Sequence, residues 1–165
     1  MVDTTLKNQT VVVTGASLGI GRATALAFGE YGANVVVNYR SSEDAAQAVV
    51  AQIEAAGGKA VAHHADMADQ EAVEALIQRG VDEFGRIDIA ISNAAHSDRD
   101  YFYQADMDGF RRTVDVTMWG AFYLTRAATQ QMISQGDGGI ITLVSSPHAF
   151  IPAPKAMAYN MSKAA

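Results

Sequence analysis

Short runs of β-branched residues alternate with longer amphipathic stretches along this 165-residue sequence. The runs TVVVT (10–14) and NVVVNYR (34–40) suit strands that are buried on both faces of a sheet. Between the apolar runs, hydrophobic positions recur every three or four residues, which is typical of one buried face of a helix. Strands that alternate with helices of this length predict an α/β fold with a doubly wound parallel sheet.

The same patterns place the remaining elements. Further strands are predicted in KAVAHHADM (59–67), RIDIAISNAA (86–95) and GIITLVSS (139–146). Helices are predicted between the first four strands, and they end at Gly32, Gly57 and Gly85. A capping box of Ser41 and Asp44 is expected to start the second helix. The expected core faces of these helices are Ile20, Ala23, Thr24, Ala27, Phe28 and Tyr31 in the first, Ala46, Val49, Val50 and Ile53 in the second, and Val73, Leu76, Ile77, Val81 and Phe84 in the third.

A longer helix is predicted from Phe110 to Met132, after a polar loop at 96–108. Its middle is apolar on two sides, because Trp119, Phe122 and Tyr123 lie opposite the first apolar face. A helix of this kind is usually buried on both sides, so we expect a second contact surface here. The tail from residue 156 is expected to start another helix.

The composition restricts the classes of partner. Apolar residues make up 49% and charged residues 18% of the chain, as in ordinary globular domains. The net charge of −6, with scattered Lys and Arg, argues against nucleic acid and anionic membranes, which both need a basic surface. The chain has no cysteine, and its histidines form no ligand cluster, so no metal site is expected. Because no apolar run resembles a signal core or a membrane span, we expect residues 1–165 to form one soluble, cytoplasmic domain.

The stretch TGASLGIG (14–21) places Gly15, Gly19 and Gly21 between the first strand and its helix. A pyrophosphate must approach backbone amides closely, and a Cβ atom at these positions would obstruct it. The N-terminus of the following helix offers unpaired N–H groups and the positive end of a dipole. Such glycines can also be purely conformational, but their position after the first strand of an alternating chain favours phosphate binding.

The end of the second strand carries candidates for reading the ribose of a dinucleotide. Tyr39, Arg40 and Ser41 stand there, and no acidic residue ends this strand to accept the 2′-hydroxyl of NAD. The guanidinium of Arg40 suits a 2′-phosphate. The sequence therefore favours NADP, with NAD as the other choice, unless Arg40 is only a solvated surface residue.

Tyr159 and Lys163 lie four residues apart and would share one face of a helix. A cation beside a phenol stabilises the phenolate, so this pair predicts a side chain that gives and takes a proton near neutral pH. Ser146 stands thirteen residues before Tyr159, at the end of the fifth strand, where its hydroxyl can polarise a carbonyl. The pair alone is a weak signal, but with a serine at the same sheet edge as the glycine turn it favours an active site.

These features together resemble the short-chain dehydrogenase/reductase family, and the match extends along nearly the whole chain. TGASLGIG is similar to the cofactor turn of the family, SNAA (92–95) to its Asn-Asn-Ala-Gly motif, and VSS with YNMSK to its active site. The resemblance implies a Rossmann sheet of about five strands in the order 3-2-1-4-5. It also implies hydride transfer between a ketone and a secondary alcohol. The stretch NYRSSEDA (38–45) is similar to glucose dehydrogenases and to 3-oxoacyl-acyl-carrier-protein reductases.

The resemblance also implies roles for individual residues. Tyr159 would be the general acid/base, Lys163 would hold the nicotinamide ribose, and Ser146 would polarise the substrate carbonyl. Asp66 would contact the adenine. The full set of implied cofactor contacts is Gly15, Ser17, Leu18, Gly19, Ile20, Gly21, Tyr39, Arg40, Ser41, Asp66, Met67, Asn93, Ala94, Ala95, Tyr159 and Lys163.

Three departures from the family pattern limit what can be carried over. The fourth catalytic residue of the family is an asparagine on the long helix, and the matching position here is Thr117, which has a hydroxyl but no amide. Ser92 and Ala95 replace the outer residues of the second motif. Family members are longer, so we expect an incomplete fold whose fifth strand is an exposed apolar edge. In the full-length form, the helix around Trp119 would form a homo-oligomer contact.

We therefore predict an NADP-preferring oxidoreductase for a small-molecule carbonyl or alcohol, with Ser146, Tyr159, Lys163 and Thr117 at its active site. A non-catalytic nucleotide-binding fragment or interaction module is the alternative, and Thr117 and the short chain favour it. Another Rossmann enzyme, such as a methyltransferase, would explain the glycine turn but gives no reason for the pair of Tyr159 and Lys163.

Overall fold

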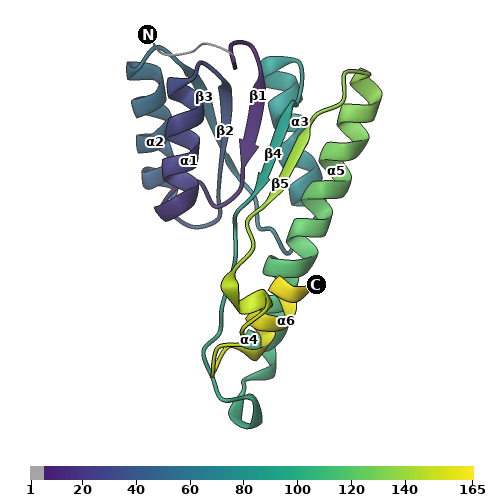
Figure 1. Ribbon diagram of the computed structural model, residues 1–165. Helices are drawn as coiled ribbons and strands as arrows, with labels where there is room; N and C mark the ends of the chain where they lie inside the picture. Colours follow the sequence, from purple (N-terminus) through teal and green to yellow (C-terminus); the bar gives the residue numbers. More distant parts are fainter. Residues whose placement is uncertain (1–5) are drawn as a thin grey trace.

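Helices cover both faces of a central parallel sheet, and a smaller helical unit lies beyond one end of it (Figure 1). The computed structural model describes residues 6–165. Its strands are β1 (Thr10–Val13), β2 (Asn34–Tyr39), β3 (Lys59–His64), β4 (Ile89–Ser92) and β5 (Ile140–Leu143). All neighbouring strands are parallel, and their order is β3-β2-β1-β4-β5. This arrangement confirms the predicted fold class and strand order.

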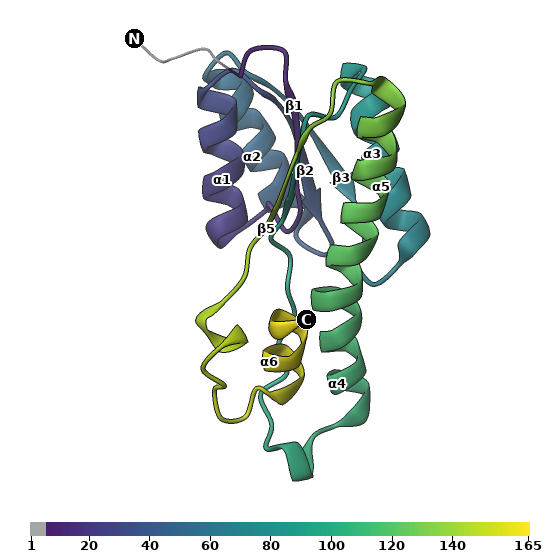
Figure 2. The same ribbon diagram turned by 45° about the vertical axis from the view of Figure 1, so that its right-hand side comes forward.

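Two pairs of helices form the outer layers. Helices α1 (Gly19–Glu30) and α2 (Glu43–Ala55) lie on one face of the sheet, and α3 (Gln70–Phe84) and α5 (Gly120–Gln135) lie on the other (Figure 2). Strand β1 serves both layers, because Val11 and Val13 pack with α1 and α2 whereas Val12 packs with α3 and α5. Burial on both faces explains why the strands are continuous apolar runs rather than alternating ones.

The remaining elements lie beyond the carboxyl ends of the strands, and we call them the distal unit (residues 96–119 and 145–165). Its elements are η1 (Phe102–Gln104), α4 (Met107–Val114), η2 (Asp115–Trp119), η3 (Pro147–Ala149) and α6 (Met157–Ala164). Helix α4 continues through η2 into α5 (Figure 2). The approximate span of the long helix was therefore predicted correctly, but its interruption by η2 was not. The segment η2 is a π-helical turn that contains Thr117. Such turns interrupt α-helices frequently at functional sites.

The predicted core faces are confirmed for two of the first three helices. Helix α2 buries its expected residues, and α3 buries Val73, Leu76 and Ile77 and ends at Gly85, whose φ is +84°. The face predicted for α1 is wrong. The side chain of Ile20 is 69% exposed, and the helix buries its small residues Gly21, Ala25 and Gly29 instead.

The reason is the short distance between α1 and its neighbours. A Cβ atom on Gly29 would lie 2.7 Å from Cγ2 of Ile53 on α2, which is closer than real contacts allow. The helix therefore needs small residues on its inner face, and periodicity based on larger apolar residues places that face incorrectly.

The capping box at the start of α2 is not formed. Its N-cap is Ser42, which makes no side-chain capping hydrogen bond, and the helix begins at Glu43. Ser41 is instead exposed and lines a cavity beside β2. Glu43 and Asp44 lie in the first turn, where carboxylates interact favourably with the helix dipole.

The outer edge of the sheet and the junction of η2 and α5 expose apolar side chains. Strand β5 pairs with β4 alone among the described strands, and Ile140 and Leu143 are exposed, as expected for an apolar edge. The predicted burial of the long helix on both sides is not observed, because no element within residues 6–165 covers Trp119 and Phe122, which are 43% and 54% exposed. These two rings contact each other instead, with centroids 5.9 Å apart. None of the helices in the described range is long and apolar enough to cross a membrane.

Candidate active site

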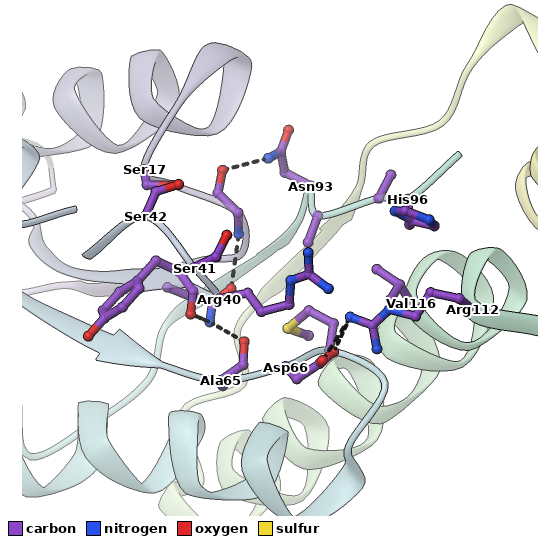
Figure 3. Close-up of a pocket in the computed structure, with 16 residues that line it drawn as sticks. Ser17, Arg40, Ser41, Ser42, Ala65, Asp66, Asn93, His96, Arg112 and Val116 are labelled. Carbon is purple, nitrogen blue, oxygen red and sulfur yellow. Dashed lines mark hydrogen bonds and ion pairs between the residues drawn. The ribbon is translucent and has the colours of Figure 1, made fainter. Parts of the chain in front are cut away.

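A cavity of about 350 Å³ opens at the carboxyl ends of the strands, and we call it the first cavity. Four loops that follow β1 to β4 supply most of its walls, and α4 and η2 close the remaining side (Figure 3). Its lining residues are Gly15, Ser17, Asn38, Tyr39, Arg40, Ser41, Ser42, Ala65, Asp66, Met67, Asn93, Ala94, Ala95, His96, Arg112 and Val116. Most of the predicted cofactor contacts therefore lie around one cavity.

Two asparagine side chains fix the glycine turn through hydrogen bonds to its backbone. The side-chain oxygen of Asn38 accepts a hydrogen bond from the backbone N–H of Gly15 at 3.0 Å. The Asn93 amide donates to the Thr14 carbonyl at 2.9 Å and to the Gly15 carbonyl at 3.3 Å. A Cβ atom on Gly21 would collide with the Gly15 carbonyl, so the turn and the helix start can pack this closely only with glycine there.

The N-terminus of α1 is free to bind an anion. Its N-cap, Leu18, makes no side-chain capping bond, and no acidic residue lies in the first turn. Gly19 has a φ of +57°, and no atom lies within 4 Å of the place where its Cβ would be. Unpaired N–H groups, the positive end of the dipole and open space beside Gly19 are what a pyrophosphate needs. The residues present therefore fit a dinucleotide, while Leu18 and Ile20 flank the turn and are exposed.

The ribose end of the first cavity follows β2. Tyr39 is buried at the end of the strand, whereas Arg40 and Ser41 are exposed and line the cavity. Figure 3 shows that Arg40 and Arg112 extend from opposite sides of this cavity. Within residues 6–165, Arg40 forms no ion pair, so its charge is available to a ligand.

Asp66, after β3, is joined to Arg112 of α4. The Nη2 atom of Arg112 lies 2.9 Å from Oδ1 and 2.7 Å from Oδ2 of the carboxylate. Burial alone would raise the pKa of Asp66, but hydrogen bonds from Arg112 and from the backbone of Ala68, with the charges of Arg112 and Arg40, lower this pKa below its ordinary value. The carboxylate is therefore held in its ionised form.

This ionisation makes a prediction for acid stability. A carboxyl group whose pKa is lower in the folded state stabilises the fold above its unfolded pKa, and this stabilisation is lost as pH falls through the folded value. Asp66→Asn should lower the free energy of unfolding by about 1–3 kcal/mol at neutral pH, and the difference from the natural protein should shrink as the pH falls through the lowered pKa of the folded state. Urea unfolding of both proteins at several pH values measures this difference in the free energy of unfolding. Asp82→Asn, at an exposed position on α3, is the control, and a difference that grows with acidity would contradict the prediction.

The predicted catalytic residues all lie in the distal unit rather than around the first cavity. Ser146 is the N-cap of η3, and its Oγ accepts a hydrogen bond from the His148 N–H at 3.2 Å. The ring centroid of Tyr159 lies 6.2 Å from that of His148 and 5.7 Å from Nζ of Lys163. Among the described residues, no hydrogen bond joins the side chains of Ser146 and Tyr159.

Lys163 points its charge toward the end of β5. Its Nζ donates to the Val144 carbonyl at 2.6 Å, and burial lowers the pKa of this amine. Together with Thr117, Lys163 lines a second, largely apolar cavity of about 610 Å³ between β5, α5 and α6. Trp119 and Phe122 also line this second cavity, which sequence reasoning did not predict.

Thr117 is tied to the backbone of the loop after β4. Its Oγ1 accepts a hydrogen bond from the His96 N–H and donates to the His96 carbonyl, both at 3.0 Å. A hydroxyl has a single proton to donate, and here that proton is used on His96. The contact supports a positioning role for Thr117, and its predicted part in proton transfer stays a prediction.

Several residues in or directly beneath the first cavity were missed by sequence reasoning. Asn38 was named only as a neighbour of Arg40, yet its polar side chain in an otherwise apolar strand was a usable signal. Nothing in the sequence indicated that Arg112 pairs with Asp66, because the two residues are 46 positions apart. The Oγ1 atom of Thr14 accepts hydrogen bonds from the backbone N–H groups of Asn93 and Ala94 at 2.9 and 3.0 Å. Sequence reasoning treated Thr14 only as the last residue of a strand and did not predict this contact. Among residues 6–165, no His, Asp or Glu side chains are grouped to hold a metal ion.

Comparison with known proteins extends the likeness to the whole chain. The sequence profile of the family described as short chain dehydrogenase matches residues 9–165. The chain is 40% identical over 159 residues to L-rhamnose 1-dehydrogenase (NAD(P)(+)) of Sphingomonas sp., covering 96% of this chain and 63% of the relative. It is 34% identical over 159 residues to glucose 1-dehydrogenase 2 of Bacillus subtilis, covering 96% and 62% of the two chains. It is 41% identical over 142 residues to 3-oxoacyl-[acyl-carrier-protein] reductase of Synechocystis sp., covering 86% and 58%.

A solved structure agrees with these sequence matches. A protein of Sinorhizobium meliloti, solved as a candidate short-chain alcohol dehydrogenase, superposes with a TM-score of 0.92 and 31% identity. The match covers 98% of this chain and 64% of that one. The chain thus spans about six tenths of the length of the curated relatives it matches. The strand order, the glycine turn and these matches together establish that the chain belongs to the short-chain dehydrogenase family.

Proposed function

We propose that this chain carries the cofactor site and the proton-transfer residues of an NADP-preferring oxidoreductase that interconverts a ketone and a secondary alcohol. One observation carries the proposal: the glycine turn leads into the uncapped N-terminus of α1, and Gly15 and Ser17 of this turn line the first cavity together with Arg40, which forms no ion pair within residues 6–165. A bound nicotinamide would exchange the hydride with the substrate carbon. We also infer that residues 1–165 form a single dinucleotide-binding domain.

Three side chains of the distal unit supply the other part of the chemistry. The Tyr159 phenol would donate a proton to the carbonyl oxygen during reduction and take it back during oxidation. Ser146 accepts a hydrogen bond from His148, which leaves its own O–H free to polarise a carbonyl. Lys163 uses one of its three N–H donors on Val144, so two remain for a ribose or for the phenolate.

The exposed aromatic side chains where η2 meets α5 support a homo-oligomer as part of the same proposal. Trp119 and Phe122 are exposed and form a cluster with half-buried Tyr123, in which the Trp119 and Tyr123 rings stack with centroids 6.1 Å apart. Exposed aromatic groups of this kind are typical of contact surfaces between subunits.

Titration of NADPH and NADH into the chain, followed by nicotinamide fluorescence, tests cofactor binding directly. The natural chain should bind NADPH more tightly than NADH. Arg40→Gln should raise the Kd for NADPH about tenfold or more, because a hydrogen-bonded charge pair with the 2′-phosphate contributes roughly 1.5–3 kcal/mol. The Kd for NADH should change little.

Arg79→Gln is the matched control for this substitution, because Arg79 pairs with Glu83 on the outer surface of α3. An Arg40→Gln chain with an unchanged ratio of the two Kd values would show that Arg40 does not select the cofactor. No binding of either dinucleotide would overturn the proposed function as a whole.

Nucleotide binding without turnover is a second candidate function. It is favoured by the position of Ser146 and Tyr159 outside the lining of the first cavity and by the hydroxyl proton that Thr117 donates to His96. A panel of ketones with NADPH separates the two candidates. NADPH binding without reduction of any ketone would support this second function, and NADPH oxidation with a ketone would reject it.

A further inference from the structure

The ion pair of Asp66 and Arg112 connects two parts of the chain at the edge of the first cavity. Asp66 belongs to the loop that leaves β3, and Arg112 reaches it from α4 (Figure 3). Both residues line the cavity, and their side chains are 32% and 28% exposed, so the pair is partly buried but open to a ligand. A contact of this type is charge-assisted and stronger than a neutral hydrogen bond.

The hydrogen bonds at Asp66 determine what kind of group can bind there. An ionised carboxylate only accepts hydrogen bonds, and its two oxygens together offer about four lone-pair positions. One nitrogen of Arg112 spans both oxygens, and the Ala68 N–H binds Oδ1 at 2.9 Å. Oδ2 therefore keeps capacity for a further bond, and a ligand group that meets it must be a donor.

The surroundings of Asp66 determine the shape of that ligand group. Ala65 and Met67 on either side of it are buried and line the cavity, and buried Val116 lies one turn after Arg112 on the opposite wall. Apolar walls with a single charged acceptor between them suit a flat heteroaromatic ring that carries an amino group at its edge.

We propose that Arg112 is a positioning residue that fixes the Asp66 carboxylate as an acceptor and thereby makes the first cavity select an aminopurine over an oxopurine base. The inference rests on the proposed function, in which a dinucleotide occupies this cavity. Arg112 touches Asp66 rather than the ligand, and its guanidinium sets both the direction and the charge of the carboxylate. An oxopurine presents a carbonyl oxygen in place of the amino group, and a fixed carboxylate repels this oxygen. The base would have to shift in the cavity before its neighbouring N1–H could bind the carboxylate instead.

The test compares the Kd of NADPH with that of reduced nicotinamide hypoxanthine dinucleotide phosphate, which differs only at the base. Nicotinamide fluorescence reports both titrations into the full chain. The natural chain should bind NADPH about tenfold more tightly, as expected for one hydrogen bond to a charged group. Arg112→Gln should reduce this ratio toward one, because the freed carboxylate can turn away or take up a proton. Arg112→Lys should give an intermediate ratio, since lysine keeps the positive charge but lacks the planar guanidinium group.

Arg111→Gln is the matched control, because Arg111 is the next residue on α4 and pairs with exposed Asp108 outside the cavity. This variant should keep the ratio of the natural chain. If Arg112→Gln does not fold, as judged by circular dichroism, Arg112→Lys and Asp66→Asn carry the test, and Asp66→Asn should also lower the ratio because an amide can donate to the oxopurine.

The possible outcomes separate this inference from the proposed function. NADPH binding with a ratio that is the same in the natural chain and the Arg112 variants would overturn the role of Arg112 and leave the cofactor site standing. A ratio near one in the natural chain would overturn base selection. No binding of either dinucleotide by the folded natural chain would overturn both. A ratio that falls in the Arg112 variants and not in Arg111→Gln would support the inference.

Discussion

Tyr159→Phe should lower the rate of ketone reduction about 10²- to 10⁴-fold, the range expected when a general acid is removed. The substitution deletes only the phenol oxygen. The ring keeps its contacts with His148, 6.2 Å away between centroids, and with the Arg99 guanidinium, 5.8 Å from the ring centroid. The loss should therefore appear in kcat, measured as NADPH oxidation, while the Kd for NADPH stays within about twofold of its natural value.

Tyr101→Phe provides the matched control. Tyr101 is an exposed tyrosine of the distal unit whose ring stacks on Tyr103 at 5.6 Å, so the same atom is removed away from the proposed active site. Its turnover should equal that of the natural protein. Full activity in Tyr159→Phe would reject Tyr159 as the acid, and a large rise in the Kd for NADPH would move its role from proton transfer to cofactor binding.

Local periodicity predicted most of the fold because the layers of this protein bury whole strands and single helix faces. The run at 34–39 and the apolar face of α2 were correctly predicted for this reason. The inner face of α1 was not, because close approach to α2 selects Gly29 for its missing side chain, and hydrophobicity scales do not detect an absent group. The π-turn η2 was also missed, since one extra residue in a helical turn changes the apolar spacing too little to be noticed.

The first cavity was predictable to the extent that it consists of strand ends. In a parallel sheet the carboxyl ends meet at one edge, so residues after β1, β2 and β4 are brought together whatever their distance in sequence. The contacts that cross from the sheet to the distal unit were not predictable. Arg112 meets Asp66, and Thr117 meets His96, only because α4 and η2 lie beside the loops of the sheet. Their partners depend on helix packing in three dimensions, which a local pattern does not contain.

These two contacts give the candidate site its form. The Asp66 and Arg112 pair connects the end of β3 to α4, and Thr117 connects η2 to the loop after β4. Helix α4 packs against α6, the helix that carries Tyr159 and Lys163. The first cavity and the proposed catalytic helix are therefore linked through α4, so a change at either contact should affect the relative position of the two parts.

Gly21→Ala should have the largest effect on cofactor binding. The new methyl group would collide with the backbone of the glycine turn, which cannot move without shifting the start of α1 as well. Its Cβ would collide with the Gly15 carbonyl and lie 2.5 Å from Nδ2 of Asn93, which itself holds the Thr14 and Gly15 carbonyls. Relief of the collision requires a shift of the turn against the start of α1. We expect the free energy of unfolding to fall by about 1–3 kcal/mol, as for other overpacked sites.

The Kd for NADPH should rise by roughly tenfold or more in Gly21→Ala, since each 1.4 kcal/mol lost from the bound state is tenfold in affinity. Gly57→Ala separates this effect from simple destabilisation. Gly57 follows the end of α2 with a φ of +88°, and no atom lies within 4 Å of the place that an alanine methyl group would occupy. Alanine there should cost about 1–2 kcal/mol of backbone strain without altering the first cavity.

Equal losses of stability in the two variants, with weakened NADPH binding in Gly21→Ala alone, would place the phosphate groups at the glycine turn. Only Gly21 packs against the Gly15 carbonyl, so strain at Gly57 has no direct route to the bound pyrophosphate. Natural affinity in Gly21→Ala would mean that the dinucleotide does not use this turn, and the close approach of α1 to the turn would then serve packing alone.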